Sequence, residues 1–557
     1  MKRLLVPALI LILTCNLFAD ETAEKSIEEQ VDAVFADWNS LETPGASLAV
    51  LRDGIVIYRK GYGSAQLEYG VPITPSTIFH VASVSKQFTA MAATMLADQG
   101  KLSLDDDIRT HLPYVPDFGV KITVRQLIHH ISGLRDQWEL LAMAGWRLDD
   151  VITLEHILKL VRHQKELNFE PGAEYLYCNT GYTLLAEIVT KVSGTPFPEW
   201  CDQNIFKPLG MTSTHFHDDH QMIVKNRSYS YSGSAENGFR KSVLSYANVG
   251  ATSLFTTVED LTNWMRNFEE KKVGGETVIA QMQNQGILNS GDDISYAHGL
   301  LVSTYRGLKT VGHGGADAGF RSSFMYFPDQ RFGVVVLSNF AAFNPADKAR
   351  KVADVYLKEV LEAKAEQEER PERTAVEIDP EVLNRYVGRF DFEDWIVATF
   401  TREEDKFFVN AAGMSKAELF PMSETEFFMK IADVLITFEK GEGEKSTKLT
   451  LLQEGTKRVA TRLPDLDVTP DLLEQYTGEY YSDELGTTYT LAVKDDALVA
   501  THRRHNDIPL EFNKVDNFLG NHWFFRKLNF IRDADKRIDG FLLTGGRVRN
   551  LRFDKVN

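Results

Sequence analysis

A serine and a lysine three residues apart, Ser83 and Lys86, lie where an extended pattern gives way to a helical one. At helical spacing the hydroxyl and the amine share one face and can touch. A serine is a poor nucleophile at neutral pH unless a neighbouring base takes its proton, and a lysine is such a base only when its pKa is lowered. The pair predicts covalent acyl transfer with Ser83 as the nucleophile, although the same spacing also fits a helix N-terminus with a solvent-facing lysine.

A tyrosine and an asparagine, Tyr177 and Asn179, follow the turn signal Pro171-Gly172 and precede an apolar pattern at helical spacing. Side chains on a loop that leads into a helix can project into a cleft. A phenol can share a proton with Lys86 and pass it to a leaving group, and an amide can hold a substrate carbonyl. The same spacing recurs in Tyr246-Ala247-Asn248, and the turn-then-helix context favours Tyr177.

The third element is His313-Gly314-Gly315, followed by Ala316. Glycines in an edge strand let a substrate backbone approach closely, and backbone N–H groups there can point at a developing oxyanion. Standing alone, the triplet is also typical of an ordinary glycine-rich hairpin.

Taken in chain order, these three elements resemble the penicillin-recognising serine hydrolases of the class C β-lactamase type, which include D-alanyl-D-alanine carboxypeptidases, D-aminopeptidases and esterases. The resemblance covers roughly residues 26–361. Four further segments share it: residues 44–50, 100–106, 122–134 and 205–211. It implies that Ser83, Lys86 and Tyr177 are catalytic, that Asn179, His313, Gly314, Gly315 and Ala316 bind substrate, and that the backbone N–H groups of Ser83 and Ala316 form the oxyanion hole.

One position departs from the pattern of this family. His313 stands where many β-lactamases carry the lysine of Lys-Thr-Gly, and in carboxylate-recognising members a lysine or hydroxyl residues on this strand hold the substrate carboxylate. Here Gly314 and Ala316 have no hydroxyl, and a histidine is neutral in most environments near pH 7. We infer a weaker carboxylate site, for which Arg321 is the candidate that compensates.

We therefore expect a serine hydrolase that cleaves small amide, ester or D-amino-acid peptide substrates through an acyl-enzyme on Ser83. The first alternative is a penicillin-binding D-alanyl-D-alanine carboxypeptidase or a β-lactamase. The second is a non-catalytic protein that binds partners with its C-terminal part. The presence of Ser83, Lys86 and Tyr177 together argues against this second alternative.

The chain has 557 residues and a formal net charge of −18. This acidic balance argues against nucleic acid as a partner, because phosphate binding requires basic clusters. We expect a small-molecule or short peptide substrate instead. The nearest approach to a metal-ligand pattern is His215-Phe216-His217 with His220, which we interpret as a polar surface loop, so we expect neither a metal nor a cofactor. The sequence leaves the oligomeric state open.

Residues 1–19 have the pattern of a signal peptide, with a basic start, an apolar run and a small residue at the cleavage point. The apolar run is too short for a comfortable membrane span, so we expect no stable span after cleavage. The expected location is periplasmic or secreted. Lipoprotein processing at Cys15 is the alternative, although Thr14 fits its signal poorly. Export permits a disulfide between Cys178 and Cys201 but does not establish one.

Strand patterns at both ends of residues 26–361, around a helical middle, predict one antiparallel sheet with helices packed on it. The expected fold is therefore α/β (α+β), and the resemblance implies the β-lactamase/transpeptidase type. The cleft between the sheet and the helices is where the three motifs would meet. Residues 362–376 are expected to form a charged linker.

Beyond the linker the sequence repeats itself. Residues 380–390 match residues 470–480 at an offset of 90, without a gap. Each repeat, residues 377–465 and residues 467–557, is rich in short alternating strands, which predicts two small antiparallel β-barrels. Closing each sheet into a barrel removes its exposed edges.

The three-part layout resembles the D-aminopeptidase branch of the family, in which lipocalin-like barrels follow the catalytic domain. In that branch a loop from a C-terminal barrel reaches the catalytic cleft and limits it to small substrates. The alternative is that the barrels are spacers or partner-binding modules, and the sequence leaves both possibilities open.

Overall fold

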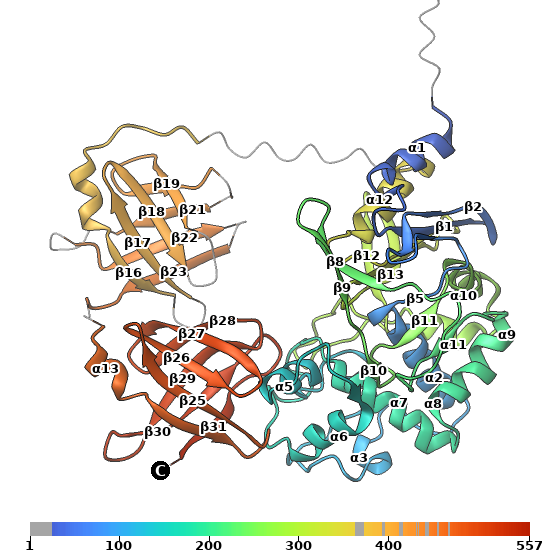
Figure 1. The fold of residues 1–557 in the computed structure, drawn as a ribbon, viewed down its shortest axis with the longest axis horizontal. Helices are drawn as coiled ribbons and strands as arrows, with labels where there is room; N and C mark the ends of the chain where they lie inside the picture. Colours follow the sequence, from blue (N-terminus) through green and yellow to red (C-terminus); the bar gives the residue numbers. More distant parts are fainter. Residues whose placement is uncertain are drawn as a thin grey trace, which may run out of the picture.

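The computed structural model describes residues 25–361 and 373–556, except residues 393–395, 412–415, 431, 433, 440–444, 454–455 and 466–467. The expected signal peptide lies outside the described residues, as does most of the expected linker. The described chain forms an N-terminal domain of helices and strands, followed by two β-barrels (Figure 1). Among the described residues, no helix combines the length and apolar character that a membrane crossing requires.

The N-terminal domain is built on a six-stranded antiparallel sheet in the order β12-β13-β14-β15-β1-β2. The neighbouring strands β15 and β1 are buried along almost their whole length because helices cover both faces of the sheet, which explains their continuous apolar runs. The hairpin between β1 and β2 turns at Asp53 and Gly54, whose φ angles of 49° and 72° suit a two-residue turn of the primed type. The strands are β1 (Ala46–Arg52), β2 (Ile55–Tyr62), β12 (Leu301–Tyr305), β13 (Leu308–Asp317), β14 (Phe320–Phe327) and β15 (Phe332–Ser338).

Helices cover the two faces of this sheet. On one face α12 (Pro345–Tyr356) packs on β14 and β15 and is itself covered by α1 (Ile27–Val34). On the other face α10 (Val258–Glu270) packs on β1 and β15, and α2 (Lys86–Asp98) pairs with α7 (Asn179–Ser193). The expectation of one antiparallel sheet with helices packed on it is confirmed.

Shorter elements complete the N-terminal domain. The helices are η1 (Ala36–Trp38), η2 (Ala82–Ser85), α3 (Ile108–His111), α4 (Val124–Ile128), α5 (Gln137–Met143), α6 (Leu154–His163), α8 (Phe197–Cys201), η3 (Asp202–Phe206), α9 (Lys207–Leu209) and α11 (Gly275–Gln281). The strands are β3 (Ser64–Gln66), β4 (Val71–Pro72), β5 (Phe79–His80), β6 (Ile152–Thr153), β7 (His215–Phe216), β8 (Ser230–Ser234), β9 (Gly238–Ser242), β10 (Tyr246–Ala247) and β11 (Leu254–Thr256).

The two C-terminal units are closed antiparallel barrels, β16 to β23 and β24 to β31, which we call barrel 1 and barrel 2. The two predicted barrels are therefore confirmed. Each begins with a short helix and then a glycine at positive φ, Gly388 at 142° and Gly478 at 136°, so the sequence repeat is also a repeat of backbone conformation. The short helices are η4 (Pro380–Arg385) and α13 (Pro470–Glu474).

The strands of barrel 1 are β16 (Gly388–Asp391), β17 (Val397–Glu403), β18 (Lys406–Ala411), β19 (Ala417–Pro421), β20 (Glu426–Phe428), β21 (Val434–Phe438), β22 (Lys448–Gln453) and β23 (Thr456–Arg462). Those of barrel 2 are β24 (Gly478–Ser482), β25 (Thr487–Lys494), β26 (Ala497–His502), β27 (His505–Lys514), β28 (Asn517–His522), β29 (Phe525–Arg532), β30 (Ile538–Thr544) and β31 (Leu551–Val556).

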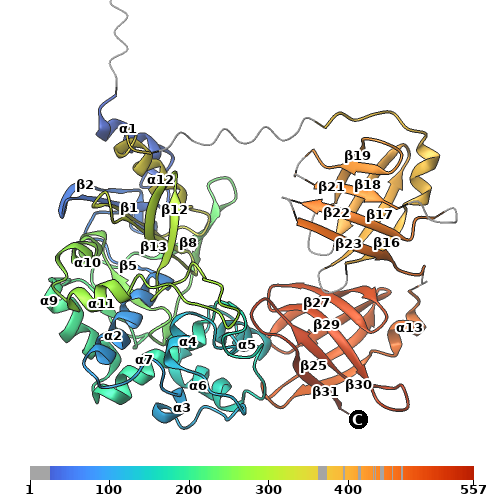
Figure 2. The same ribbon diagram turned by 180° about the vertical axis from the view of Figure 1, so that it is seen from behind.

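Barrel 2 is joined to the N-terminal domain, whereas barrel 1 has a core of its own. One continuous apolar cluster contains buried residues of both the N-terminal domain and barrel 2, and the buried residues of barrel 1 form a separate cluster. Both views show barrel 2 lying against α5 (Figures 1 and 2). The interface also buries an ion pair between Arg135 and Glu484, whose side chains are 1% and 6% exposed. This charge pair is satisfied only when the two units are docked.

The connection between β30 and β31, residues 545–550, is held against α5 by its backbone. The Glu139 carboxylate accepts hydrogen bonds from the N–H groups of Gly546 at 3.0 Å, Arg547 at 2.7 Å and Val548 at 2.9 Å. The Arg547 carbonyl in turn accepts a hydrogen bond from Asn168 Nδ2 at 2.9 Å. Backbone groups make these bonds, so this part of the anchoring does not depend on the side chain of Arg547.

We predict that Glu139→Ala weakens the docking of barrel 2. The substitution leaves three backbone N–H groups without their acceptor at a buried position, which is expected to cost about 1–3 kcal/mol. The measurement is the urea midpoint of the full chain. The matched control is Glu174→Ala, because Glu174 makes an exposed ion pair with Arg549 in the same interface and such pairs contribute at most about 1 kcal/mol. Equal midpoints for the two variants would contradict the role of Glu139.

Candidate active site

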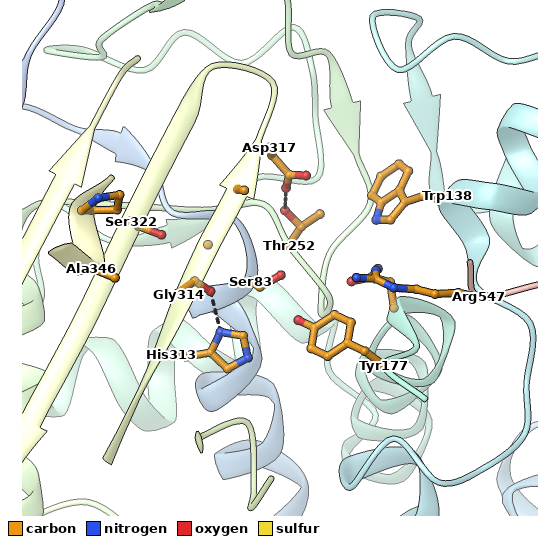
Figure 3. A pocket seen from close by; sticks show the side chains of 14 residues that line it. Ser83, Trp138, Tyr177, Thr252, His313, Gly314, Asp317, Ser322, Ala346 and Arg547 are labelled. Carbon is orange, nitrogen blue, oxygen red and sulfur yellow. Dashed lines mark hydrogen bonds between the residues drawn. The ribbon is translucent and has the colours of Figure 1, made fainter. Parts of the chain in front are cut away.

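A cavity of about 440 Å³ lies between β13, the short helix η2 and the loops that lead into α5 and α7 (Figure 3). The site residues predicted from the sequence line it except Lys86, which lies behind Ser83, and Arg321. The predicted residues that line it are Ser83, Tyr177, Asn179, His313, Gly314, Gly315 and Ala316, and the others are Trp138, Thr252, Asp317, Ser322, Pro345, Ala346 and Arg547.

Ser83 is presented on a tight turn at the start of α2. The preceding residue, Ala82, has φ 48°, in the left-handed region that costs a non-glycine residue about 1–2 kcal/mol. Two hydrogen bonds hold this turn: Ser85 Oγ donates to the Ala82 carbonyl at 2.5 Å, and the Ala82 N–H donates to His80 Nδ1 at 3.2 Å. The strained turn sets Ser83 at the cavity wall while Lys86, one helical turn later, stays beneath it.

The Lys86 amine is fully buried and has three acceptors. Its Nζ lies 3.1 Å from Ser83 Oγ, 2.8 Å from Asn179 Oδ1 and 2.7 Å from the Ala251 carbonyl oxygen. Burial lowers the pKa of Lys86 to about 7, and two carboxylates in the surroundings limit the shift because they favour the charged form. A neutral amine keeps two N–H donors and one lone pair. It can therefore donate to Asn179 and Ala251 while accepting the Ser83 proton.

A carboxylate fixes the orientation of the amide that contacts Lys86. Asp136 Oδ2 accepts hydrogen bonds from Asn179 Nδ2 at 2.8 Å and from the Asn179 N–H at 2.7 Å. Because a carboxylate can only accept, the amide nitrogen of Asn179 must face Asp136 and the amide oxygen must face Lys86. Asp136, Asn179, Lys86 and Ser83 thus form one chain of polar contacts.

Tyr177 brings a buried hydroxyl to the nucleophile. Its Oη has no hydrogen-bond partner among the described residues and points toward Ser83 (Figure 3). Burial raises the pKa of the Tyr177 phenol well above its ordinary value, while the nearby Ser83 hydroxyl acts in the opposite direction. The phenol therefore stays neutral at pH 7, and a group that arrives beside Ser83 would find an unused O–H donor.

The cavity wall opposite Tyr177 is a stretch of β13 that pairs with a neighbouring strand on one side only. In the described chain, β12 pairs with β13 only as far as Gly312, whereas β14 pairs with it from Val311 to Asp317. Residues 313–317 therefore have one open edge. At Gly315 a Cβ atom would lie 2.3 Å from the Val81 carbonyl oxygen, so only glycine lets β13 pack this closely on the turn before Ser83.

His313 is neutral and both of its ring nitrogens are engaged. Its Nδ1 donates to the Gly314 carbonyl at 2.5 Å, because a carbonyl can only accept, and its Nε2 accepts from Tyr296 Oη at 3.0 Å. Burial, with the charge of Lys86 as a smaller contribution, lowers the pKa of His313 to about 4. His313 thus offers the cavity no positive charge at neutral pH.

Asp317 supplies a carboxyl group at the far end of the same strand edge. It accepts a hydrogen bond from the Thr252 hydroxyl. Burial raises the pKa of Asp317 above its ordinary value, and Thr252 and Lys86 act against this shift. The cavity therefore contains an acidic group in addition to the polar chain behind Ser83.

The prediction that Arg321 supplies the compensating positive charge is wrong. Arg321 is not among the residues that line the cavity, and its Nη1 donates to the carbonyl groups of Ala318 and Phe320. The positive charge at the cavity comes instead from Arg547 of barrel 2. The alternative tyrosine, Tyr246, is buried in the core and stacks on Trp138 at a ring distance of 4.7 Å, so the structure brings Tyr177 and not Tyr246 to Ser83.

Sequence reasoning missed seven of the residues that line the cavity, among them Trp138, Asp317 and Arg547, and it also missed Asp136, which binds Asn179. Asp136 had a local signal, because an aspartate immediately before a helical pattern is a typical N-cap, and its side chain does accept from the Trp138 N–H. Asp317 follows the His-Gly-Gly motif closely. Arg547 had no local signal for the site, since its partners lie about 400 residues earlier in the chain.

Of the other residues singled out in the sequence, His217, Cys178 and Cys201 are buried, whereas His220 is exposed. The interpretation of residues 215–220 as a polar surface loop is wrong for His217, which is buried with its ring against Phe255. Within the described ranges, no group of three or more histidine, cysteine, aspartate or glutamate side chains is arranged to hold a metal ion. Cys178 and Cys201 are both buried and are not joined to each other.

Curated relatives match most or about half of the chain. A penicillin-binding protein of Bacillus subtilis (strain 168) is 27% identical over 437 residues, which are 73% of this chain and 93% of that protein. A D-aminopeptidase of Gluconobacter oxydans (strain 621H) is 29% identical over 296 residues, which are 53% of this chain and 56% of that protein. The match thus spans little more than half the length of the D-aminopeptidase.

Solved structures share the fold. An octameric penicillin-binding protein homologue from Pyrococcus abyssi has a TM-score of 0.56 at 23% identity, covering 86% of this chain and 98% of that chain. A D-amino acid amidase from Ochrobactrum anthropi SV3 has a TM-score of 0.51 at 22% identity, covering 60% and 99%. At these identities the likeness shows the fold.

A family model described as Beta-lactamase matches residues 25–357, which is more than half of the chain and contains all three motifs around the cavity. This chain therefore belongs to the beta-lactamase family and is a serine hydrolase of that fold.

Proposed function

We propose that the chain hydrolyses small amides, esters or peptides of D-amino acids through an acyl-enzyme on Ser83. The observation that carries the proposal is the contact of a buried amine, Lys86 Nζ, with Ser83 Oγ at 3.1 Å inside a cavity that also holds the unused hydroxyl of Tyr177. A nucleophile, a base and an acid are therefore in place before any substrate arrives.

Lys86 is the base in this proposal and Tyr177 is the acid. The lowered pKa gives the amine a lone pair near pH 7, whereas the raised pKa of the phenol keeps it from accepting a proton. Ser83 Oγ bonds to the substrate carbonyl carbon as its proton passes to Lys86. Tyr177 then protonates the leaving nitrogen or oxygen as the bond between that atom and carbon breaks. Lys86 passes the proton that it took from Ser83 to Tyr177, which restores the phenol.

Water completes the cycle by the reverse route. It attacks the acyl carbon as its proton passes to the same amine, and Lys86 then gives that proton to Ser83 Oγ as the bond from Oγ to the acyl carbon breaks. In both steps we assign the oxyanion to the backbone N–H groups of Ser83 and Ala316, because β13 packs directly on the turn that carries Ser83. The open edge at residues 313–317 would hold the substrate backbone, with Gly314 and Gly315 allowing close approach.

The substrate class follows from the size of the cavity and from the relatives. Barrel 2 closes one side of the cavity with Arg547, which favours small substrates over long polymers. The relatives include D-aminopeptidases and a D-amino acid amidase. Asp317 provides a carboxyl group that can pair with the free ammonium of an amino-acid substrate.

A second candidate is a penicillin-reactive carboxypeptidase. The Bacillus subtilis penicillin-binding protein is matched over 93% of its length, which favours this candidate. The two candidates share the same nucleophile. Incubation with benzylpenicillin and intact-mass measurement separates them, because stoichiometric acylation of Ser83 is expected only of the penicillin-reactive enzyme.

We predict that Ser83→Ala abolishes turnover and that Tyr177→Phe lowers it by about 10²-fold or more, because the phenol supplies the leaving-group proton. The measurement is hydrolysis of D-alanine p-nitroanilide beside p-nitrophenyl butyrate. The matched control is Tyr246→Phe, since Tyr246 is buried against Trp138 and does not line the cavity.

The outcomes of this experiment separate the possibilities. Amide turnover that is lost in Ser83→Ala supports an aminopeptidase or amidase, and turnover of the ester alone supports an esterase. Activity that survives in Ser83→Ala contradicts the mechanism, and a loss in Tyr246→Phe without a loss in Tyr177→Phe shows that the acid is misassigned.

We predict that activity rises with pH through a midpoint near 7, as Lys86 loses its proton, and that Asp136→Asn moves this midpoint to lower pH. The direction follows from the sign of the interaction: Asp136 favours the charged amine and raises the pKa of Lys86, so its removal lowers that pKa. The measurement is the pH dependence of kcat/KM for p-nitrophenyl butyrate. Glu155→Gln on the exposed face of α6 is the control. A midpoint that stays fixed or moves to higher pH in Asp136→Asn would contradict the network.

A further inference from the structure

Arg547 differs from the other arginines at the interface between barrel 2 and the N-terminal domain. Arg135 pairs with Glu484 at 2.5 Å, and Arg549 pairs with Glu174 at 3.0 Å. Arg547 Nη1, by contrast, lies 4.0 Å from Asp136 Oδ2. That oxygen already accepts two hydrogen bonds from Asn179, and the Arg547 guanidinium makes no hydrogen bond within the described part of the chain. Its N–H donors are therefore available.

The side chain of Arg547 is aimed at the reacting groups. The guanidinium lies between Trp138 and Tyr177 and points toward Ser83 (Figure 3). Its central carbon is 4.9 Å from the centroid of the Tyr177 ring, and the side chain is 43% exposed and lines the cavity. The ring contact stabilises this position of the guanidinium without using its N–H donors.

The backbone holds this arginine in place independently of its side chain. The Arg547 N–H donates to Glu139 and its carbonyl accepts from Asn168. The backbone is thus ordered before a ligand arrives, and the contact with the Tyr177 ring holds the side chain over the cavity, which lowers the ordering cost of binding an anion.

We propose that Arg547 binds a carboxylate of the substrate, so that the enzyme prefers amides and esters that carry a free carboxylate close to the scissile bond. This proposal rests on the proposed function. A guanidinium presents a planar fork of donors that matches a carboxylate with two parallel hydrogen bonds. Arg547 of barrel 2 thus takes the role that the sequence analysis gave to Arg321 of the N-terminal domain.

The other charges of the cavity favour a monoanion over a phosphate. Asp136 and Asp317 are both acidic, so a dianion would be repelled by two groups while it is attracted by one. A carboxylate pairs one to one with Arg547. Asp317 is then left to meet an ammonium, which makes the cavity complementary to a substrate that carries both charges.

Two pairs of chromogenic substrates test the proposal and locate the carboxylate. Mono-p-nitrophenyl adipate and its methyl ester differ only by a charge on the acyl half. D-Alanyl-5-amino-2-nitrobenzoate and D-alanine p-nitroanilide differ by a carboxylate on the leaving half. We expect the wild type to have the higher kcat/KM for the charged member of at least one pair.

Arg547→Met is expected to lower the ratio of kcat/KM for the charged to the neutral member by about 10- to 100-fold, the effect of losing a hydrogen bond between charged groups. Arg549→Met is the matched control, since it removes the same charge from the same loop at a residue outside the cavity. It should leave the ratio unchanged. Thermal unfolding of both variants checks that the loop and barrel are intact.

The outcomes distinguish this proposal from the proposed function. If none of the four substrates is cleaved, or if cleavage survives in Ser83→Ala, the proposed function fails. If any of the four substrates is cleaved in a Ser83-dependent way, the proposed function stands. The carboxylate site then fails when neither pair shows a preference for charge, or when Arg547→Met leaves the ratio unchanged, or when Arg549→Met lowers it equally.

A measurement on the wild type alone tests the proposal without relying on the folding of a variant. Added salt should lower kcat/KM for the preferred charged substrate and leave its neutral partner unaffected, because screening weakens the attraction between the guanidinium and the carboxylate. Equal salt dependence for both members of the pair would overturn the proposal.

Discussion

The site depends on shielding one amine, that of Lys86, from water at a position next to Ser83. Burial removes the water that would otherwise stabilise the ammonium, and the lowered pKa leaves Lys86 able to accept a proton near neutral pH. Such an amine is stable only if its N–H groups are satisfied, and the Asn179 amide and the Ala251 carbonyl satisfy them. The pairing of α2 with α7 and the tight turn at Ala82 meet this requirement, because they bring acceptors and the nucleophile to Lys86 Nζ.

The second organising feature is a division of labour between two folding units. The N-terminal domain provides the nucleophile, the amine, the phenol and the strand edge, whereas barrel 2 provides a positive charge. Glu139 connects them by binding the backbone of residues 545–550, and the shared apolar cluster makes barrel 2 part of the same body. Barrel 1, with a core of its own, does not line the cavity.

Local patterns predicted the parts of this arrangement that are local in the chain. The spacing of Ser83 and Lys86, the turn before Tyr177 and the repeat of 90 residues each reflect the geometry of one element or its copy. The remaining parts are long-range contacts, such as Ala251 meeting Lys86 from 165 residues away and the loop meeting Glu139 across about 400 residues. No periodicity encodes such contacts, and for this reason the sequence directed attention to Arg321, which is near His313 in the chain, and missed Arg547.

The duplicated barrels differ at the hairpin that carries this arginine. In barrel 1, β22 ends at Gln453 and β23 begins at Thr456, whereas in barrel 2 six residues separate Thr544 from Leu551. The connection in barrel 2 is thus the longer of the two, and main-chain atoms bind it to Glu139. Substitutions at Arg547, whose side chain lines the cavity, can change what the cavity accepts while the main-chain bonds and the buried Val548 keep the loop docked. The loop is therefore an evolvable module, and a natural point at which to graft a different selectivity onto an unchanged catalytic apparatus.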